Sequence, residues 1–146
     1  MILIKENFIK EGIMKVLNIS TKKRNEFVDI TSEIEKLVEE ENVEEGICII
    51  FCPHTTAGLT INENADPSVK KDIISHLEEI VPFDKNYSHL EGNTDSHIKS
   101  SLLGNSLNLI IHQGKLVLGI WQGVYFCEFD GPRTRNVYVK VIKEDV

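Results

Sequence analysis

The sequence predicts an α+β fold: one domain with a mixed, mainly antiparallel sheet and about three helices. Strand-forming segments occur in groups joined by turn-like residues, and helix-forming segments separate the groups. Single strands alternating with helices would instead have indicated a parallel sheet. With 146 residues, 41% of them hydrophobic and 27% charged, the chain is long enough for one domain with its own core.

The first dozen residues differ from the rest because they show no clear hydrophobic period. We therefore divide the chain into an N-terminal extension, residues 1–12, and a domain of residues 13–146. Within the domain, residues 13–19 and 26–30 read as strands separated by a charged turn. Ser32 and Glu35 have the spacing of a capping box, which predicts that a helix begins there. Its apolar face comprises Ile34, Leu37 and Val38.

The middle of the chain is predicted to hold two strands and a longer helix. Residues 46–52 form a continuous apolar run, as expected for a strand buried on both faces. A short strand follows at residues 59–61. Asp66 and Pro67 are a strong helix start, with Asp66 as N-cap. The buried stripe of that helix is predicted to consist of Val69, Ile73, Leu77 and Ile80.

The last third predicts a short helix and three strands. Thr94 or Asp95 caps a helix that Gly104 closes. Residues 107–111 are expected to pair, across a turn at 112–115, with one long strand over residues 116–129. After a turn at 130–133, valines alternate in a final strand at Val137, Val139 and Val141.

Charge, hydropathy and cysteine usage exclude several classes of protein. A net charge of −7 opposes nonspecific nucleic-acid binding, and no apolar run reaches the roughly 20 residues that span a bilayer. Cys48 and Cys52 would lie about 13 Å apart in one strand, too far for a disulfide. Buried, reduced thiols and a cytoplasmic location are therefore expected.

Histidines near polar partners indicate a possible metal site. His54, His89 and His97 lie at predicted strand ends or in loops, and three imidazoles with an open fourth position are typical of catalytic zinc. Glu63 and Glu91 are candidates to complete or orient that shell. The alternative is three separate surface or capping histidines. HExxH, P-loop and GxSxG motifs are absent from the sequence.

Other residues are candidates for binding a ligand. Arg133, Arg135 and Lys99 together could grip a phosphate, although they could equally be separate surface charges. Trp121, between Gly119 and Gly123, could form a pocket wall, and core packing is the alternative. The remaining candidates are amides near these groups: Asn64, Asn93 and Gln122.

Three ordered motifs resemble those of the YjbQ-like family. They are Pro53-His-Thr-Thr-Ala57 with Asn62-Glu-Asn-Ala-Asp-Pro67, His89-Leu-Glu-Gly-Asn93 with His97-Ile-Lys-Ser-Ser101, and Gly119-Ile-Trp-Gln-Gly123 with Cys127-Glu-Phe-Asp-Gly-Pro-Arg133. The resemblance covers residues 13–142. One departure is Ile120, where the family usually has threonine, so a hydroxyl that could position a ligand is lacking.

The resemblance implies a homotrimer of compact α+β subunits with polar sites near the subunit boundaries. It also implies a weak, secondary thiamine-phosphate synthase activity, which joins a pyrimidine-methyl diphosphate to a thiazole phosphate and releases diphosphate. That reaction needs a divalent metal, zinc or magnesium, or cations that stabilise the departing diphosphate. His97, Glu63 and Glu91 would be the catalytic groups, and His54, His89 and His97 the metal ligands. Asn64, Asn93, Lys99, Trp121, Gln122 and Arg133 would bind substrate.

Two hypotheses of different classes follow. The first is a metal-assisted enzyme that acts on a small phosphorylated heterocycle. The second is a non-catalytic trimeric protein that binds a metal or a small anion. The expected partners are further copies of the chain and a small phosphorylated ligand, without nucleic acid or membrane.

Overall fold

The computed structural model describes residues 2–9 and 12–145, and it confirms an α+β domain with three helices and antiparallel sheets. In chain order the elements are β1 Ile2–Ile9, β2 Gly12–Ser20, β3 Glu26–Asp29, α1 Thr31–Glu40, β4 Glu45–Phe51, β5 Ala57–Glu63, α2 Pro67–Ile80, α3 Thr94–Leu103, β6 Ser106–His112, β7 Lys115–Leu116, β8 Gln122–Glu128 and β9 Thr134–Lys143. None of the helices in these described ranges has the length and apolar character needed to cross a membrane.

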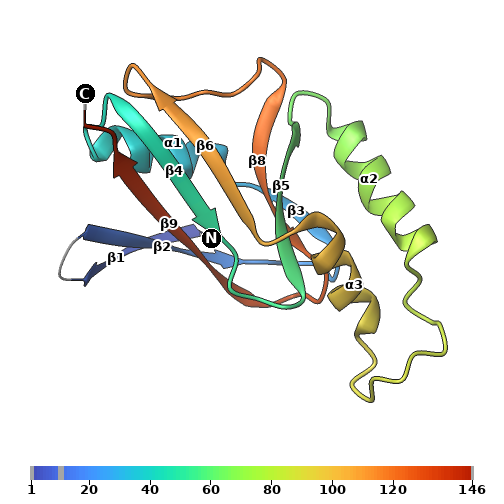
Figure 1. Ribbon diagram of the computed structural model, residues 1–146. Coiled ribbons are helices and arrows are strands. Elements are labelled where there is room, and N and C mark those ends of the chain that lie inside the picture. The colour runs from blue at the N-terminus through green and yellow to red at the C-terminus, as the bar shows by residue number, and fades with distance from the viewer. Residues whose placement is uncertain (1, 10–11, 146) are drawn as a thin grey trace.

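The strands form two sheets. Six strands lie in the order β1-β2-β9-β4-β6-β7, and three in the order β3-β8-β5. Every pairing in the described residues is antiparallel. In Figure 1, β4, β6 and β9 lie in front of α1, while α2 and α3 flank the smaller sheet on its outer side. The two sheets therefore enclose a core between them.

Two apolar clusters hold these layers together. The larger one joins the inner faces of both sheets to α1, and it includes fully buried Leu17, Ile50 and Phe126. The smaller one lies on the other face of β8, where Phe27, Tyr125, Cys127 and Phe129 meet apolar residues of α2 and α3. Full burial of a side chain such as Leu or Phe stabilises the fold by about 1.5–3 kcal/mol. Cys48, Cys52 and Cys127 are buried free thiols, as predicted.

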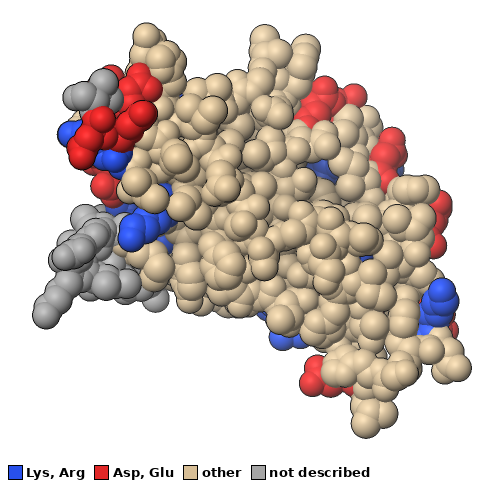
Figure 2. All heavy atoms as spheres, viewed as in Figure 1, with Lys and Arg blue, Asp and Glu red and all other residues tan. Residues whose placement is uncertain are grey.

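The larger sheet leaves one face open. Ile47, Ile110 and Ile142 are cross-strand neighbours on β4, β6 and β9, and their exposed fractions are 47%, 63% and 44%. Figure 2 shows that this face is mostly uncharged, with acidic and basic side chains gathered toward its edges. The prediction that β4 is buried on both faces is therefore wrong for a single subunit.

Several predicted boundaries also differ from the structure. The long strand expected over residues 116–129 is divided, because residues 117–121 leave the sheet between β7 and β8. In that segment Ile120 is 90% exposed. The predicted hairpin turn is correct, since Ile111 pairs with Leu116. Residues 2–9 of the proposed extension form β1, which pairs with β2 from Gly12 to Ile19.

The observed N-caps of the three helices agree only in part with the capping motifs in the sequence. Asp66 caps α2 as predicted, accepting a hydrogen bond from the Ser68 amide. The capping box at Ser32 does not form, because Ile30 occupies the N-cap of α1 without a side-chain cap. At α3 the N-cap is Asn93 rather than Thr94 or Asp95.

The apolar stripe predicted for α2 is only half-buried. No residue of this helix is fully buried, and Ile80, at its end, is 56% exposed. Ile73 and Leu77 do pack against the smaller core cluster. The helix therefore covers the small sheet as a surface layer and not as part of the core.

Candidate functional site

A polar pocket of about 280 Å³ lies where four segments meet at one end of the two sheets. Its lining residues come from the loop between β4 and β5, the turn between β8 and β9, the start of β9, and the segment that begins α3. Antiparallel pairing brings these together, since Ala57 at the start of β5 is opposite Glu128 at the end of β8. The lining residues are Pro53, His54, Thr55, Thr56, Glu91, Asn93, His97, Asp130, Arg133 and Arg135.

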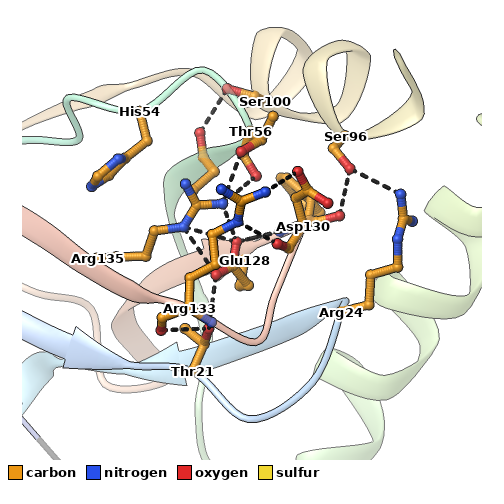
Figure 3. Close-up of polar contacts among 12 residues, drawn as sticks. Thr21, Arg24, His54, Thr56, Ser96, Ser100, Glu128, Asp130, Arg133 and Arg135 are labelled. Carbon is orange, nitrogen blue, oxygen red and sulfur yellow. Dashed lines mark hydrogen bonds and ion pairs between the residues drawn. The ribbon is translucent and has the colours of Figure 1, made fainter. Parts of the chain in front are cut away.

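The wall of the pocket rests on a buried ion pair. Arg135 and Glu128 are 4% and 0% exposed, and the Arg135 Nε atom lies 3.0 and 3.1 Å from the two carboxylate oxygens. The Thr21 hydroxyl donates to the same carboxylate at 2.7 Å, and Arg135 also donates to the Thr56 hydroxyl at 2.8 Å. Figure 3 shows this network between His54 and Asp130. Its hydrogen bonds compensate part of the cost of burying two charges.

Because of this pairing, Arg135 has a structural role. Its Nε and Nη2 atoms are committed to Glu128 and Thr56, whereas Nη1 makes no hydrogen bond among the described residues. Arg135 and Arg133 line the same pocket, but Lys99 lines a different hollow, so the grouping of all three around one phosphate is not formed in the structure.

Arg133 is the more accessible cation of the pocket. Its side chain is 51% exposed and pairs with the Asp130 carboxylate at 2.7 Å, while its Nε donates to the Asp130 carbonyl. Asp130 in turn accepts a hydrogen bond from the Asn93 amide at 2.8 Å. Arg133 is thus oriented by Asp130 and still open to solvent, which suits recognition of an anion.

The turn that carries Asp130 and Arg133 is held against the turn after β2. The Gly131 amide donates to the Arg24 carbonyl at 3.1 Å, and a Cβ atom at Gly131 would lie only 2.2 Å from the Lys23 carbonyl oxygen. The close approach of two backbones therefore requires glycine at this position.

His54 is anchored to the backbone of β9. Its Nε2 atom lies 2.9 Å from the Asn136 nitrogen and 3.1 Å from the Asn136 oxygen, so that atom is engaged in either tautomer. Burial lowers the pKa of His54, and the neighbouring Arg135 charge lowers it further. A largely neutral imidazole results, with Nδ1 as the nitrogen left for a ligand.

His97 lies in the first turn of α3 and contacts His89. Their ring centroids are 5.5 Å apart, with the rings edge to face. Glu91, whose side chain is 75% exposed, has a carboxylate oxygen 3.8 Å from His89 Nε2. His89 itself lines a shallow hollow next to the pocket, together with His97 and Thr94. His97 and Glu91 therefore face the pocket, and His89 lies at its border.

Two polar atoms beside the pocket have no hydrogen-bond partner in the described part of the chain. They are the Asn93 Oδ1 and Thr94 Oγ1 atoms, which are both buried. A buried acceptor without a partner costs roughly 1–3 kcal/mol, and such groups are uncommon in native proteins. Both atoms belong to the start of α3, between Glu91 and His97, which are two of the predicted site residues.

The histidines and carboxylates around the pocket have donor atoms that suit a divalent metal, but they do not form a complete set of metal ligands. Imidazole nitrogen and carboxylate oxygen are ordinary ligands of zinc. Two imidazoles on one tetrahedral zinc ion have ring centroids about 5 Å apart, close to the separation of His89 and His97. Within residues 2–9 and 12–145, no three His, Cys, Asp or Glu side chains gather closely enough to hold a metal ion.

Four predicted site residues lie elsewhere. Glu63 and Gln122 are register partners at the opposite end of β5 and β8. Six residues of strand place them about 20 Å from Ala57 and the pocket. Asn64 follows Glu63, and its amide donates to Asp29 at 3.1 Å. Trp121 is 59% exposed there and lines neither the core nor the pocket. In one subunit, the structure does not bring these residues to His97.

Lys99 is also separate from Arg133. It is 1% exposed and lines a second hollow, beside Asp95 and Arg24. Sequence reasoning treated Asp95 as a possible helix cap, whereas its carboxylate forms a double hydrogen bond with Arg24 at 2.7 and 3.0 Å. Burial acts to raise the pKa of Asp95, but the hydrogen bonds from Arg24 and the positive charges of Arg24 and Lys99 together hold it below its usual value.

Sequence reasoning missed Glu128 and treated Asp130 only as a turn residue. A signal for Glu128 was present, because it interrupts the apolar run from Val124 to Phe129. A charged residue inside such a run is expected to be paired when buried. For Asp130 the sequence contains no comparable signal, since aspartate is common in turns.

Comparison with known proteins agrees with the motifs. The profile of the family described as "UPF0047 protein YjbQ-like" matches residues 15–144. The chain is 52% identical to the UPF0047 protein YugU of Bacillus subtilis over 131 residues, covering 89% of this chain and 99% of that protein. It is 59% identical to a UPF0047 protein of Methanocaldococcus jannaschii over 124 residues, covering 85% and 90%.

Solved structures show the same fold. An uncharacterised YjbQ/UPF0047 protein of Clostridium acetobutylicum has a TM-score of 0.86 and 52% identity, covering 87% of this chain and 98% of that one. A YjbQ-like protein of unknown function from Sulfolobus solfataricus has a TM-score of 0.87 and 30% identity, covering 97% and 100%. This chain therefore belongs to the UPF0047 YjbQ-like family.

Proposed function

We propose that the polar pocket lined by His54 and His97, called the histidine pocket from here on, is the active site of a metal-assisted transferase that acts on a small phosphorylated heterocycle. The reaction we assign to it is thiamine-phosphate synthesis, in which a thiazole phosphate displaces diphosphate from a pyrimidine-methyl diphosphate. The observation that carries the proposal is the convergence of His97, Glu91, Asn93 and Arg133 on one pocket. These side chains combine metal-type donors with a phosphate-type donor.

Arg133 is assigned to the phosphate. Its planar guanidinium can donate two parallel hydrogen bonds to phosphate oxygens. Asp130 restrains the side chain from one side, while half of it stays accessible. Because the phosphate charge persists throughout the reaction, this contact contributes to binding more than to the chemical step.

A divalent metal would be held by the imidazoles of His97 and His89, with phosphate oxygens of the substrate completing its ligands, because the described side chains do not form a set of three. Magnesium in particular is commonly bound by one or two carboxylates together with substrate phosphates. The metal supplies stabilisation of the charge on the departing diphosphate. The chain's own contribution is to orient the imidazoles and the Asn93 amide at the start of α3.

The predicted site residues at the far end of β5 and β8 would contribute to the pocket only from a second subunit. Trp121, Gln122, Glu63 and Asn64 lie at the far end of β5 and β8, about 20 Å away in the same chain. In a homotrimer, we place this end of one subunit near the pocket of the next. Trp121 would then face the heterocyclic ring, and its 59% exposure in the subunit is consistent with a contact made elsewhere.

The surface proposed for trimer formation is the open face of the larger sheet. The apolar run over residues 116–129 does not supply this surface, because β8 is mostly buried inside the subunit. The isoleucine row formed by Ile47, Ile110 and Ile142, with Phe51 beside it at 40% exposure, is the better candidate. An uncharged apolar face of this kind is uncommon on monomeric proteins. A second copy is the occupant we assign to it.

Replacing His97 by alanine is expected to reduce thiamine-phosphate formation by about 100-fold or more, because a metal ligand beside the leaving group is lost. The measurement is product formation by the purified protein, first with chelator and then with added magnesium or zinc. His76→Ala is the matched control, since His76 is exposed on α2 and pairs only with Glu79 among the described residues. Wild-type turnover and wild-type metal content in the His97 variant would remove His97 from the site.

Arg133→Ala is expected to act mainly on substrate affinity. The Michaelis constant should rise about tenfold or more, while kcat changes less, because a phosphate contact is made in both the ground and the transition state. Steady-state kinetics with each phosphorylated substrate varied separately measure this. An equal fall in kcat with an unchanged Michaelis constant would contradict the assignment.

Binding without turnover is the second candidate function. It is favoured by the extent to which pocket residues already pair, with Arg133 on Asp130 and His54 on the β9 backbone. Calorimetry with the thiazole phosphate and with each metal ion separates the two candidates. Tight stoichiometric binding without product formation would support a binding protein over an enzyme.

A further inference from the structure

A hollow of about 430 Å³ lies beside the histidine pocket and shares two lining residues with it. It is bordered by the loop between β4 and β5, by α3 and by the residues that connect α3 to β6 (Figure 1). We call it the α3 hollow, and its lining residues are Thr55, His97, Ser100, Ser101, Gly104 and Asn105. Because Thr55 and His97 also line the histidine pocket, the two spaces adjoin at His97.

The histidine pocket is small for the reaction proposed above. Its volume is about 280 Å³, whereas sites for small molecules usually have roughly 300–1,000 Å³, and the reaction brings two heterocycles together. The α3 hollow extends the available space from His97 to Gly104. That distance is about 10 Å along the helix axis, which is long enough for a ring with its substituents.

The two spaces differ in charge. The histidine pocket contains both basic and acidic side chains, among them Arg133 and Asp130. By contrast, the residues that line the α3 hollow include no lysine, arginine, aspartate or glutamate. The two spaces therefore suit different parts of one ligand, with ionic groups in the histidine pocket and an uncharged part in the α3 hollow.

Two side chains of the α3 hollow are available to a ligand. Thr55 and Asn105 are exposed, and their side chains make no hydrogen bond with the described part of the chain. The backbone that carries Asn105 is nevertheless fixed. The Asn105 carbonyl accepts a hydrogen bond from the Cys52 amide at 2.7 Å, and the Gly104 carbonyl accepts one from the Leu59 amide at 3.0 Å. The Asn105 amide group is thus held at the hollow by main-chain contacts.

The Asn105 side chain indicates the kind of ligand. An asparagine amide presents a donor and an acceptor side by side. The matching edge is an amino group next to a ring nitrogen, which is how asparagine pairs with adenine in two hydrogen bonds. Ser101 adds an acceptor, because its hydroxyl already donates to the His97 carbonyl at 2.9 Å and its oxygen lone pairs remain.

We propose that the α3 hollow binds an uncharged, amino-substituted nitrogen ring, with the Asn105 amide paired to the amino group and the adjacent ring nitrogen. The proposal rests on the function proposed above, since it assigns the pyrimidine part of the diphosphate substrate to this hollow. The phosphate groups of that substrate then extend past His97 toward Arg133. Asn105 is a binding residue in this arrangement and takes no part in the chemical step.

The test measures ring binding without phosphate, metal or turnover. The probe is 4-aminopyrimidine, and pyrimidine, which lacks the amino group, is the matched control ligand. Each is titrated into the isotope-labelled full chain above neutral pH, where both are uncharged, and the backbone amide signals are followed by NMR. 4-Aminopyrimidine is expected to bind about threefold to tenfold more tightly, because it makes the additional hydrogen bond. The largest shifts are expected at Thr55, Ser101 and Asn105.

Variants locate the site. Asn105→Ala should lower the affinity for 4-aminopyrimidine to that for pyrimidine, and Ser101→Phe should abolish binding of both rings because it fills the hollow. Asn86→Ala is the control, since Asn86 is exposed between α2 and α3 and does not line the hollow. Circular dichroism establishes that each variant is folded.

Two results would overturn the proposal: shifts that lie away from the hollow, or unchanged affinity in the Asn105 variant. Neither depends on product formation, so the transferase is tested separately. A chain that binds 4-aminopyrimidine through Asn105 but forms no product would refute the transferase and retain the ring site. A chain that forms product equally well with and without the Asn105 side chain would refute the ring site and retain the transferase.

Discussion

Glu128→Ala is expected to lower the free energy of unfolding by about 3–5 kcal/mol, because it leaves the buried Arg135 charge without its partner. Arg135 is only 4% exposed, so water cannot replace the carboxylate. The variant also removes the acceptor of the Thr21 hydroxyl and of the Phe129 and Asp130 amides. Urea denaturation, with the slope of the transition compared between variants, measures the loss.

The matched control is Glu39→Ala, which removes an exposed carboxylate on α1 and should change stability by less than about 0.5 kcal/mol. The double variant Glu128→Leu, Arg135→Met removes both charges together. It should recover part of the loss, because no buried charge remains unpaired. A Glu128→Ala protein as stable as the control would mean that the ion pair contributes little to the fold.

Ile110→Lys is expected to dissociate the proposed homotrimer into single subunits. Ile110 is 63% exposed on β6, at one end of the isoleucine row and between the β4 and β7 strands. A lysine there would place a charge in the proposed apolar contact, and desolvating an unpaired charge costs several kcal/mol at each interface. Light scattering at micromolar concentration should give three times the mass of one chain for the wild type and one chain for the variant.

Ile80→Lys provides the control, since Ile80 is 56% exposed on α2, away from the open sheet face. It should leave the assembly unchanged. Circular dichroism of both variants establishes that they are folded. A wild-type chain that is monomeric under these conditions would refute self-association, and with it the contribution of Trp121 to a neighbouring pocket. Equal dissociation by both variants would refute the choice of surface.

The helices and strands that the sequence predicts correctly are those whose structure is set by residues close together in the chain. Asp66 and Pro67 begin α2 because a cap and a fixed proline φ act within a few residues of the chain. The alternation of Val137 and Val139 predicts β9 for a similar reason. The break at 117–121 had one local signal, Gly119, because glycine weakens the interior of a strand, but the other residues of the segment are apolar and strand-like by composition. Burial of β4 on both faces was also overestimated, since an apolar run does not reveal which face the subunit itself covers.

For the site, the sequence identified the residue types and the structure decided their grouping. His54, Glu91, Asn93, His97 and Arg133 do lie around one pocket. Lys99 lies in another hollow, and Trp121 with Gln122 lies at the far end of β8. Spacing along the chain says nothing about which end of an antiparallel strand pair a motif will occupy. Those assignments depend on the pairing of β5 with β8.

The sequence by itself therefore determined the α+β class, the free buried cysteines, the family and most of the side chains that meet at the histidine pocket. Each of these depends on composition, on short-range periodicity or on motifs that are local in the chain. Only the tertiary structure decided that Glu128 holds Arg135 beneath the pocket and that Lys99 faces a separate hollow beside Asp95. Those contacts join residues from different elements, and they follow from the packing of two sheets and three helices, which no local pattern encodes.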